Sequence, residues 1–385
     1  MKVAVIGIGC TKFGEHWDKN IQDLLSASQL EAIEDAKISP NDIDAIFSGN
    51  MCGGIFSGQQ HIGAIAAEIL NLNVASSVVE AACASGGVAI RSGLQAILSG
   101  LAEVVLVNGV EKMTDTKTPQ ATTGLMLAAS EELELFQGAT FPALNAMIAK
   151  KYMNDYGLTR EQLAMVSVKN HKHATLNPLA QFKKEITIEN VINSTMVSDP
   201  LTLLDCAPIS DGSASLILCS EKFAKKINKP AIYIVGSGQA SDSLALQNRK
   251  SLTEMKATQI AAKTAYKIAN VTPDDIDVTE LHDGFSIVEI LSLEDLGYFK
   301  KGEAGKATSD GKTFFDGEKP VNPSGGLKGK GHPVGATGVS QAIEIVKQLR
   351  GECKANQVKN AKIGLTHNIG GCGTTAVVHI FKKEK

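Results

Sequence analysis

The residue with the clearest chemical potential is Cys83, which lies in the segment 77–100, SVVEAACASGGVAIRSGLQAILSG. This segment opens with the β-branched pair Val78 and Val79 and continues, after two glycines, as an amphipathic helical pattern. A thiol at such a strand-to-helix turn faces unpaired N–H groups and the positive end of the helix dipole, which favours the thiolate and lowers the thiol pKa. We interpret Cys83 as a nucleophile. The alternative is that it is a small packing residue, as cysteines among alanines and glycines often are.

Two histidines lie in motifs that suit a partner for this thiol. His332 belongs to GKGHPVGATG (329–338) and comes just before a predicted helix, whereas His282 belongs to LHDGF (281–285) and ends a predicted strand. A neutral imidazole at His332 is able to take the thiol proton and so generate the nucleophile. Each histidine also has a structural interpretation, because GHPxG is a good turn and a lone histidine is often a core residue.

A third motif, THNIGGCGTT (366–375), is a glycine-rich turn after a predicted strand. Its backbone N–H groups are suited to an oxyanion hole. It also carries Cys372, a candidate second acid/base. In combination with Cys83, His282 and His332, this turn indicates a Cys/His acyl-transfer site.

The elements that must position these motifs are repeated along the chain. An internal repeat of this length indicates a duplicated fold. Because strands and helices alternate in each copy, we expect an α/β protein with a mostly parallel sheet and right-handed crossovers in each half. The corresponding segments are 2–9 (KVAVIGIG) and 231–238 (AIYIVGSG), 38–44 (ISPNDID) and 271–277 (VTPDDID), 86–100 and 337–351, and 104–109 and 361–366.

The region from about 115 to 205 has no counterpart in the second copy, so we interpret it as an insertion that lies over the first half. The first half then ends with the predicted strand SDGSASLILCS (210–220). The expected parts are an N-terminal half with the nucleophilic cysteine, an inserted loop domain and a C-terminal half. Their boundaries are 1–115 plus 205–225, 116–204, and 228–385.

The composition excludes several function classes. With 43% hydrophobic and 21% charged residues and a net charge of −3, the chain of 385 residues has no basic bias toward nucleic acid and no apolar run long enough for a membrane span. Its seven scattered cysteines include no CxxC pair, which favours a reducing cytoplasmic location over a disulfide framework or a zinc site. The sequence His171-Lys172-His173 favours a polar helix surface over a metal site. No metal or redox cofactor is implied.

Taken together, these motifs resemble the thiolase family over the whole chain. The cysteine motif, LHDGF, GHPVGATG and THNIGGCG occur in the family's order, and GHPVGATG is the most specific of them. The HDxF form is similar to the sterol-carrier-type and archaeal branch, as is the sequence from IGCTKFGE onward. The resemblance implies an acetyl-CoA C-acetyltransferase that condenses two acetyl-CoA molecules to acetoacetyl-CoA and CoA by a ping-pong route and feeds the mevalonate pathway.

The resemblance also implies a five-layer αβαβα fold with an inserted loop domain, assembled as a homodimer or tetramer. In such an enzyme Cys83 would be acylated and His332 would be its activating base. His282 and His332 would hold the thioester oxygen of the second acyl group. The backbone N–H groups of Cys83 and Gly370 would form the oxyanion hole of the acyl-enzyme.

The chain departs from the family where the second acid/base is expected. Sterol-carrier-type members have a cysteine in HDCF, where this chain has Gly284, and other thiolases have one in C-x-G, where this chain has Asn368. Cys372 lies four residues later and either substitutes for that cysteine or is a packing residue. If Cys372 does not act, His282 becomes the candidate base for the α-proton.

Two alternative functions remain open. A degradative 3-ketoacyl-CoA thiolase would need a wider acyl pocket, and a non-catalytic CoA- or lipid-binding scaffold would be expected to lose Cys83 or His332, both of which are present. Because condensation of two acetyl-CoA molecules is uphill, the resemblance further suggests a complex with HMG-CoA synthase and a DUF35-type OB-fold protein. The Lys-rich loop 300–312 and the insertion are candidate places for CoA contacts.

Overall fold

The computed structural model describes residues 2–227 and 231–384. Residue 228, where the C-terminal half is expected to begin, and residue 385 lie outside the described residues. The strands are β1 (Val3–Cys10), β2 (Ala45–Gly49), β3 (Ala75–Val79), β4 (Val104–Glu111), β5 (Met196–Ser198), β6 (Leu201–Thr202), β7 (Gly212–Ser220), β8 (Ile232–Ser241), β9 (Val278–Leu281), β10 (Ile363–Gly370) and β11 (Thr375–Lys383).

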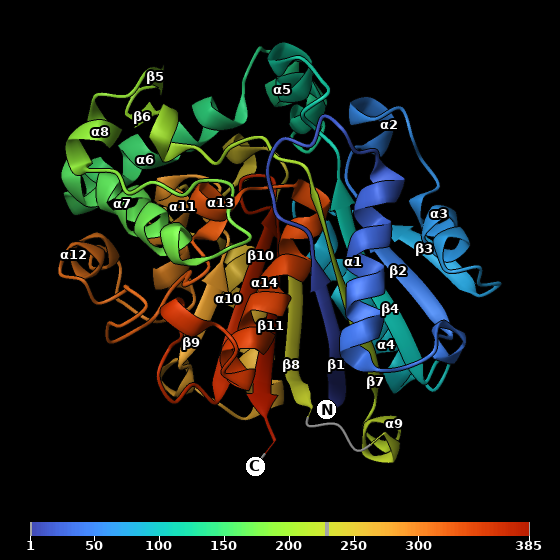
Figure 1. Cartoon of the computed structure of the whole chain (residues 1–385). Helices are drawn as coiled ribbons and strands as arrows, with labels where there is room; N and C mark the ends of the chain where they lie inside the picture. Colours follow the sequence, from blue (N-terminus) through green and yellow to red (C-terminus); the bar gives the residue numbers. More distant parts are fainter. Residues whose placement is uncertain (1, 228–230, 385) are drawn as a thin grey trace.

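Helices surround and separate these strands (Figure 1). They are α1 (Ile21–Ala36), α2 (Gly53–Phe56), α3 (Ile62–Ile69), α4 (Ser85–Leu98), α5 (Thr118–Met126), α6 (Phe141–Tyr156), α7 (Arg160–Leu176), α8 (Ile188–Ile192), α9 (Glu221–Lys226), α10 (Lys256–Ala269), α11 (Ser286–Asp295), α12 (Ala304–Ser309), α13 (Gly326–Lys330) and α14 (Val334–Arg350).

Nine strands form one sheet in the order β3-β2-β4-β7-β1-β8-β11-β10-β9, and β1 joins the two halves by pairing with β8. The expectation of a mostly parallel sheet is wrong. Only β2 with β3, β2 with β4, and β9 with β10 are parallel, and the other pairs are antiparallel. The reason is connectivity, because β10 and β11 are joined by a short glycine turn and such a hairpin can only be antiparallel.

The helices and the sheet form five layers, because the two halves of the sheet, β3-β2-β4-β7-β1 and β8-β11-β10-β9, lie on either side of a central pair of helices. Helices α4 and α14 pack on each other and contact strands of both halves, so they make a central layer. Helix α1 covers the outer face of β1 and β7, and α10 covers the outer face of β8 and β11 (Figure 1). The order helix, sheet, helix, sheet, helix is the one that the resemblance implies.

Glycine pairs in the first strand of each half explain the close packing of the outer helices. A Cβ at Gly7 or Gly9 would collide with the backbone of α1, and a Cβ at Gly236 or Gly238 would collide with the backbone of α10. The two Gly-x-Gly sequences therefore serve the same purpose in both halves, which is to let a helix lie directly on the strand. This equivalence supports the predicted duplication.

The matched heptapeptides also fold alike. Each forms a 3-10 turn with a capping box, in Pro40–Asp42 and Pro273–Asp275. The aspartate that ends each heptapeptide then accepts two backbone N–H groups from the neighbouring strand start. Asp44 accepts from residues 103 and 104 at 2.7 and 2.9 Å, and Asp277 accepts from residues 362 and 363 at 2.8 and 2.9 Å.

The segment between β4 and β7 holds α5 to α8 and the small hairpin of β5 and β6, and it lies over one end of the sheet, at the top of Figure 1. It is the region that the sequence marks as an insertion. The expectation that it lies over the first half is wrong for its longest helix, because α7 packs on α11, α12 and α13 of the C-terminal half. Its exact limits at 116 and 204, and those of the two halves, stay predictions.

The histidines of α7 are not on a polar helix surface, so that expectation is wrong. His171 and His173 are both buried. His173 donates from Nδ1 to the backbone oxygen of Asn322 at 2.9 Å and accepts the Phe315 N–H at Nε2 at 3.2 Å, while His171 stacks on Phe182. Burial lowers the pKa of His173 to about 3. Among the described residues no group of three metal-ligating side chains is present.

Candidate active site

Cys83 lies at the tight turn between β3 and α4. Ala82 adopts a left-handed conformation with φ of +53°, which is uncommon for a residue with a side chain. The Ser85 hydroxyl stabilises the turn, because it donates to the Ala82 oxygen at 2.6 Å and accepts the Ala81 N–H at 3.0 Å. Strained turns of this kind are found at functional sites.

Glycines bring the N-terminus of α4 against that of α14. A Cβ at Gly86 would lie 2.7 Å from the oxygen of Gly335, and one at Gly338 would collide with the backbone of Gly87. The two helices therefore meet backbone to backbone. Because Cys83 precedes one helix and His332 precedes the other, this contact places both residues at one cavity, as the repeat predicts.

The cavity has a volume of about 90 Å³ and is mostly apolar. Three of the residues that line it have titratable side chains, namely Cys83, His282 and His332. The other lining residues are Met113, Leu125, Phe141, Asn145, Ala207, Pro208, Ile209, Gly284, Phe285, Val288, Val334, Ile369 and Gly371.

The thiol of Cys83 does not have the low pKa that the sequence predicts. Burial raises its pKa to about 12, and the nearby Glu111 carboxylate adds to this, although an N–H from Gly371 to the sulfur acts in the opposite direction. The prediction from the helix dipole is wrong because desolvation of the thiolate outweighs the dipole at a buried sulfur. The resting Cys83 side chain is therefore a neutral thiol, which would need a base to act as a nucleophile.

His332 is a neutral imidazole with a fixed orientation. Burial lowers its pKa to about 3. Its Nδ1 lies 2.7 Å from the Thr337 hydroxyl, which itself donates to the oxygen of Pro333 at 2.9 Å. The backbone N–H of His332 donates to the Ser210 hydroxyl at 3.0 Å. The first turn of α14 thus holds the ring that the sequence proposes as base.

His282 follows β9 and faces His332 edge to face, with ring centroids 5.0 Å apart. Burial, and then the two nearby histidines His332 and His367, lower its pKa well below the usual range. Its Nδ1 is 3.3 Å from the Nδ2 of Asn368, and Gly284 leaves the Nε2 edge uncovered, because a Cβ there would lie 3.2 Å from Nε2. Both histidines are therefore neutral at physiological pH.

Buried charges hold the loop that carries His282. The Asp283 carboxylate accepts N–H groups from Leu327 at 2.6 Å and Lys328 at 3.2 Å and the Asn170 amide at 2.7 Å. Lys328 in turn donates from Nζ to the backbone oxygen of Asp205. The aspartate of LHDGF is thus a structural residue that joins the loop to α7 and α13.

The glycine-rich turn lies beside Cys83 as expected, but the glycine whose N–H faces the sulfur is one residue later than predicted. Gly371, rather than the predicted Gly370, lines the cavity and directs its N–H to the sulfur of Cys83. Gly370 ends β10 and packs against the backbone of the Cys83 turn, where a Cβ would collide with Ala81. Its own role in an oxyanion hole stays a prediction.

Cys372 is not among the residues that line the cavity. Its sulfur is buried and accepts the Asn145 side-chain N–H at 3.5 Å, and it is the Asn145 side chain that lines the cavity. Burial raises the pKa of Cys372 to about 12. The structure therefore brings Cys83, His282 and His332 together at the cavity. Cys372 does not line the cavity, although it is near enough to raise the pKa of Cys83.

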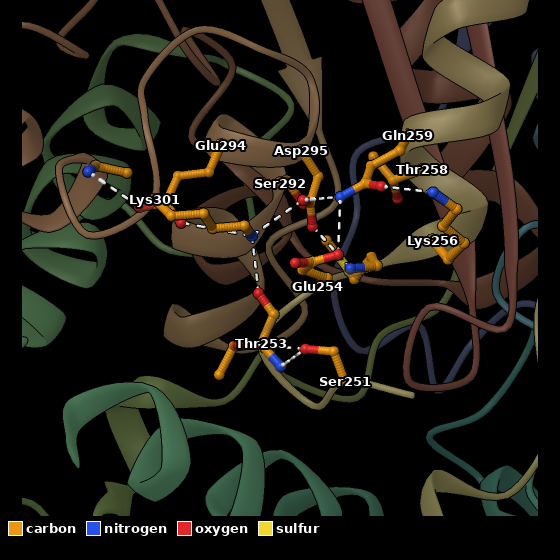
Figure 2. Close-up of polar contacts among 12 residues, drawn as sticks. Ser251, Thr253, Glu254, Lys256, Thr258, Gln259, Ser292, Glu294, Asp295 and Lys301 are labelled. Atoms are coloured by element: carbon orange, nitrogen blue, oxygen red, sulfur yellow. Dashed lines mark hydrogen bonds and ion pairs between the residues drawn. The ribbon is translucent and has the colours of Figure 1, made fainter. Parts of the chain in front are cut away.

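Arg249 stabilises the glycine-rich turn, and Thr253, four residues later, belongs to a separate ionic network. Arg249 donates to the Cys372 oxygen at 2.7 Å and to the Thr374 hydroxyl at 3.0 Å. Further along the same segment, the Lys301 ammonium bridges Asp295 at 2.9 Å and the oxygen of Thr253 at 2.7 Å (Figure 2).

Three of the four lysines in the loop 300–312 have acidic partners, and the role of this loop in CoA binding stays a prediction. Lys301 is largely buried in its network of acids, which also includes Glu294 at 3.6 Å (Figure 2). Two others already have carboxylate partners. These pairs are Lys306 with Asp310 at 2.6 Å, and Lys312 with Glu318 at 3.2 Å.

Sequence reasoning missed four residues that act on the site. These residues are Glu111, Asn145, Thr337 and Asn368. Glu111 accepts N–H groups from residues 51, 52 and 335 and from the Asn50 side chain, at 2.9 to 3.2 Å, and burial raises its pKa to about 7. The only available signal was a lone acid at the end of a hydrophobic strand, which many structural residues share.

A thiol and a neutral imidazole at crossing helix N-termini, with backbone N–H donors beside them, define a cysteine–histidine acyltransferase. The comparisons agree with this class. The model described as "Thiolase, N-terminal domain" matches residues 3–222, and "Thiolase C-terminal domain-like" matches residues 238–383. The chain therefore belongs to the thiolase family.

Two relatives are similar over essentially the full chain. "Acetyl-CoA acetyltransferase" of Methanothermobacter thermautotrophicus is 53% identical over 382 residues, which are 99% of both chains. The protein of the same name from Methanocaldococcus jannaschii is 48% identical over an aligned length of 392 residues, gaps included, and the match covers 100% of this chain and 99% of the other. "Sterol carrier protein 2" of Homo sapiens is 34% identical over 99% of this chain and 72% of its own length.

A solved structure described as "Ltp2-ChsH2(DUF35) aldolase" has a TM-score of 0.86 and 26% identity, and the match covers 100% of this chain and 98% of the other. The family and the branch inferred from GHPVGATG and HDxF are confirmed. Among the described residues no helix is long and apolar enough to cross a membrane.

Proposed function

We propose that this chain is an acetyl-CoA acetyltransferase that condenses two acetyl-CoA molecules to acetoacetyl-CoA and CoA, or catalyses the reverse thiolysis. The observation that carries the proposal is the convergence of Cys83 and His332 at one cavity beside the N–H of Gly371. The two archaeal relatives of that name support acetyl-CoA as the substrate.

In the first half-reaction His332 takes the proton of Cys83 and the sulfur attacks the acetyl thioester. The donors beside the sulfur, the N–H of Gly371 and that of Cys83 itself, stabilise the oxyanion. The bond to CoA breaks, and the CoA thiolate receives the proton from His332. In the second half-reaction another acetyl-CoA lies against His282 and His332, with its carbonyl oxygen at His282.

Short acyl groups are the substrates that this cavity favours. Its walls include the bulky side chains of Phe141, Phe285, Leu125 and Met113, and its volume is about 90 Å³. A degradative thiolase for long chains needs a wider pocket, so the cavity argues for the biosynthetic alternative. CoA thioesters are substrates here, and the proposal requires no further cofactor.

We also propose an oligomeric state, a protein partner and a cellular location for this chain. Strand β3 is an open edge of the nine-stranded sheet and exposes Val78, which suits association of two copies into a homodimer or tetramer. The structural neighbour that is a complex with a DUF35 protein supports a DUF35-type partner. With such a partner and HMG-CoA synthase, the product would pass into the mevalonate pathway in the cytoplasm, where a catalytic thiol stays reduced.

Thiolysis of acetoacetyl-CoA by CoA tests the proposed function. We expect turnover with acetoacetyl-CoA, slower turnover with longer 3-ketoacyl-CoA, and a loss of about a thousandfold or more in Cys83→Ser and His332→Gln. Cys353→Ser, on a loop after α14, is the matched control and keeps full activity. Equal activity of Cys83→Ser and Cys353→Ser would overturn the proposal in favour of a binding scaffold.

A further inference from the structure

The cavity contains few groups that are able to move a proton. Cys83, His282 and His332 are the titratable side chains among its described lining residues. Once Cys83 carries an acetyl group, only the two histidines remain to remove the α-proton of a second acetyl-CoA. Which of them is the base depends on which ring nitrogen of each carries the proton.

Backbone groups determine the tautomer of His282 through Asn368. The Asn368 oxygen accepts the N–H of Gly87 at 3.1 Å, and its Nδ2 donates to the oxygen of Cys83 at 3.0 Å. These two backbone partners fix the orientation of the amide, so its second N–H points to Nδ1 of His282 at 3.3 Å. Nδ1 is therefore unprotonated, and Nε2, on the side of Gly284, carries the proton. His282 enters the reaction as a donor.

Thr337 determines the opposite tautomer for His332. The Thr337 hydroxyl has one proton, which it donates to the oxygen of Pro333 at 2.9 Å. It therefore accepts from Nδ1 of His332, 2.7 Å away. Nδ1 of His332 carries the proton and Nε2 has the free electron pair. His332 enters the reaction as a base.

The other candidate base lies outside the cavity. The Cys372 sulfur accepts the Asn145 side-chain N–H, and Cys372 does not line the cavity, whereas Gly284 does. Asn368 is itself fully engaged with Cys83, Gly87 and His282. No thiol other than that of Cys83 is present among the described residues of the cavity wall.

We infer that His332 is the single base of both half-reactions and that His282 is the neutral donor to the enolate, with Thr337 and Asn368 as positioning residues that set these opposite tautomers. The inference rests on the proposed function. After acetylation and release of CoA, Nε2 of His332 takes a proton from the methyl carbon of the second acetyl-CoA. The electron pair moves to the thioester oxygen, which accepts the Nε2–H of His282.

The carbon–carbon bond then forms as the enolate carbon attacks the acetyl group on Cys83. The bond between that carbonyl and the sulfur breaks, and the sulfur leaves with its electron pair. It receives the proton that His332 holds, which regenerates the neutral thiol and the neutral imidazole. Protons and electrons balance without a second thiol, and the high pKa of Cys83 favours this final proton return.

Exchange of the methyl protons of acetyl-CoA for deuterium in D2O isolates the proton-transfer step. In Cys83→Ala no acyl-enzyme forms, so exchange reports the base alone. We expect exchange in Cys83→Ala, a rate within about twofold when Cys372→Ala is added, and a loss of about a hundredfold when His332→Gln is added. His282→Gln in the same background is expected to slow exchange, because the enolate loses its donor.

Two results would overturn the inference. One is exchange that is lost with Cys372→Ala while thermal stability is unchanged, and the other is exchange that survives His332→Gln. Acetylation and condensation by the wild type are measured in parallel. A wild type that never becomes acetylated would overturn the proposed function instead, so the two failures are distinct.

Thr337 is tested by an isosteric substitution. Thr337→Val fills the same space but cannot accept from Nδ1, so the rates of acetylation and of exchange are both expected to fall about tenfold or more, whereas Thr337→Ser restores the hydroxyl and the rates. A purely structural role predicts instead that both variants lose thermal stability and that the exchange rate of folded Thr337→Val is normal. That result would contradict the assignment.

Discussion

At the scale of single residues, burial decides how this site works. A thiol and an imidazole that were both exposed would share a proton near neutral pH. Here burial raises the pKa of Cys83 to about 12 and lowers that of His332 to about 3, so both are neutral over the whole physiological range. In the proposed mechanism the proton moves only when the thioester arrives, and the neutral thiol is less open to side reactions with oxidants.

The pH profile of acetylation follows from these values. Cys83 loses its proton only toward pH 12 and His332 gains one only toward pH 3, so neither group changes the rate between pH 5 and 9. Glu111, with its pKa raised to about 7 by burial, is the titrating neighbour, and its negative charge opposes the thiolate. The rate of acetylation, measured by stopped flow, is expected to fall modestly as the pH rises through 7. In Glu111→Gln this change of the rate with pH is expected to disappear. A rise of ten-fold or more across that range would indicate a low thiol pKa instead.

Gly284 gives a second prediction at this scale. A methyl group at this position would lie 3.2 Å from Nε2 of His282 and crowd the edge that faces the substrate. We expect Gly284→Ala to slow condensation about tenfold or more and to leave acetylation of Cys83 near the wild-type rate, because only the second half-reaction uses this edge. Equal loss of both half-reactions would contradict the role of His282.

At the scale of elements, the site depends on the contact between the N-termini of α4 and α14. This contact is predictable from the sequence, because Gly87 and Gly338 occur at matching places of the repeat. The helix at 21–36 and the strand starts are also predictable, but from a different signal, which is the regular spacing of their apolar residues. Cys83 and His332 therefore meet where the repeat predicts.

The remaining features require the three-dimensional structure. The antiparallel pairs of β7 and β11 depend on where the insertion and the glycine turn return the chain, which local periodicity does not show. The burial of His173 depends on Asn322 and Phe315, more than a hundred residues away. The parts of Thr337 and Asn368 in the site depend on backbone partners in other elements, so their residue types alone predict nothing about tautomers.

The matched aspartates test the duplication as a physical equivalence. Asp44 and Asp277 each accept two backbone N–H groups at the start of a neighbouring strand. We expect Asp44→Ala and Asp277→Ala each to lower the free energy of unfolding by about 1 kcal/mol and to leave thiolysis unchanged. Urea unfolding measures the first effect. A loss in only one of the two variants would show that the halves are not equivalent at this position.

At the scale of the whole molecule, neither half contains the site alone. Cys83 comes from the N-terminal half, whereas His282, His332 and Gly371 come from the C-terminal half, and the apolar wall includes residues of the inserted segment. The continuous sheet through β1 and β8 and the central helix layer hold these parts in one rigid arrangement. Duplication therefore supplied two helix N-termini, and divergence gave one a thiol and the other an imidazole.

Association of two copies is also a property at this scale. Val78 is 40% exposed on the edge strand β3. We expect Val78→Lys to shift the protein toward the monomer in sedimentation velocity, because a charged edge residue opposes strand-to-strand pairing. Lys2→Ala, next to the central strand β1, is a control that keeps the assembly. A wild type that sediments as a monomer at micromolar concentration would contradict the proposed homo-oligomer.

The most direct measurement for the central claim is the intact mass of the protein after brief exposure to acetyl-CoA, followed by peptide mapping. We predict one added acetyl group on Cys83 in the wild type and in Cys372→Ser, and none in Cys83→Ser. Addition of free CoA is expected to remove the group as acetyl-CoA. The absence of an adduct on the wild type, or an adduct that persists in Cys83→Ser, would contradict the claim that Cys83 is the nucleophile of a thiolase.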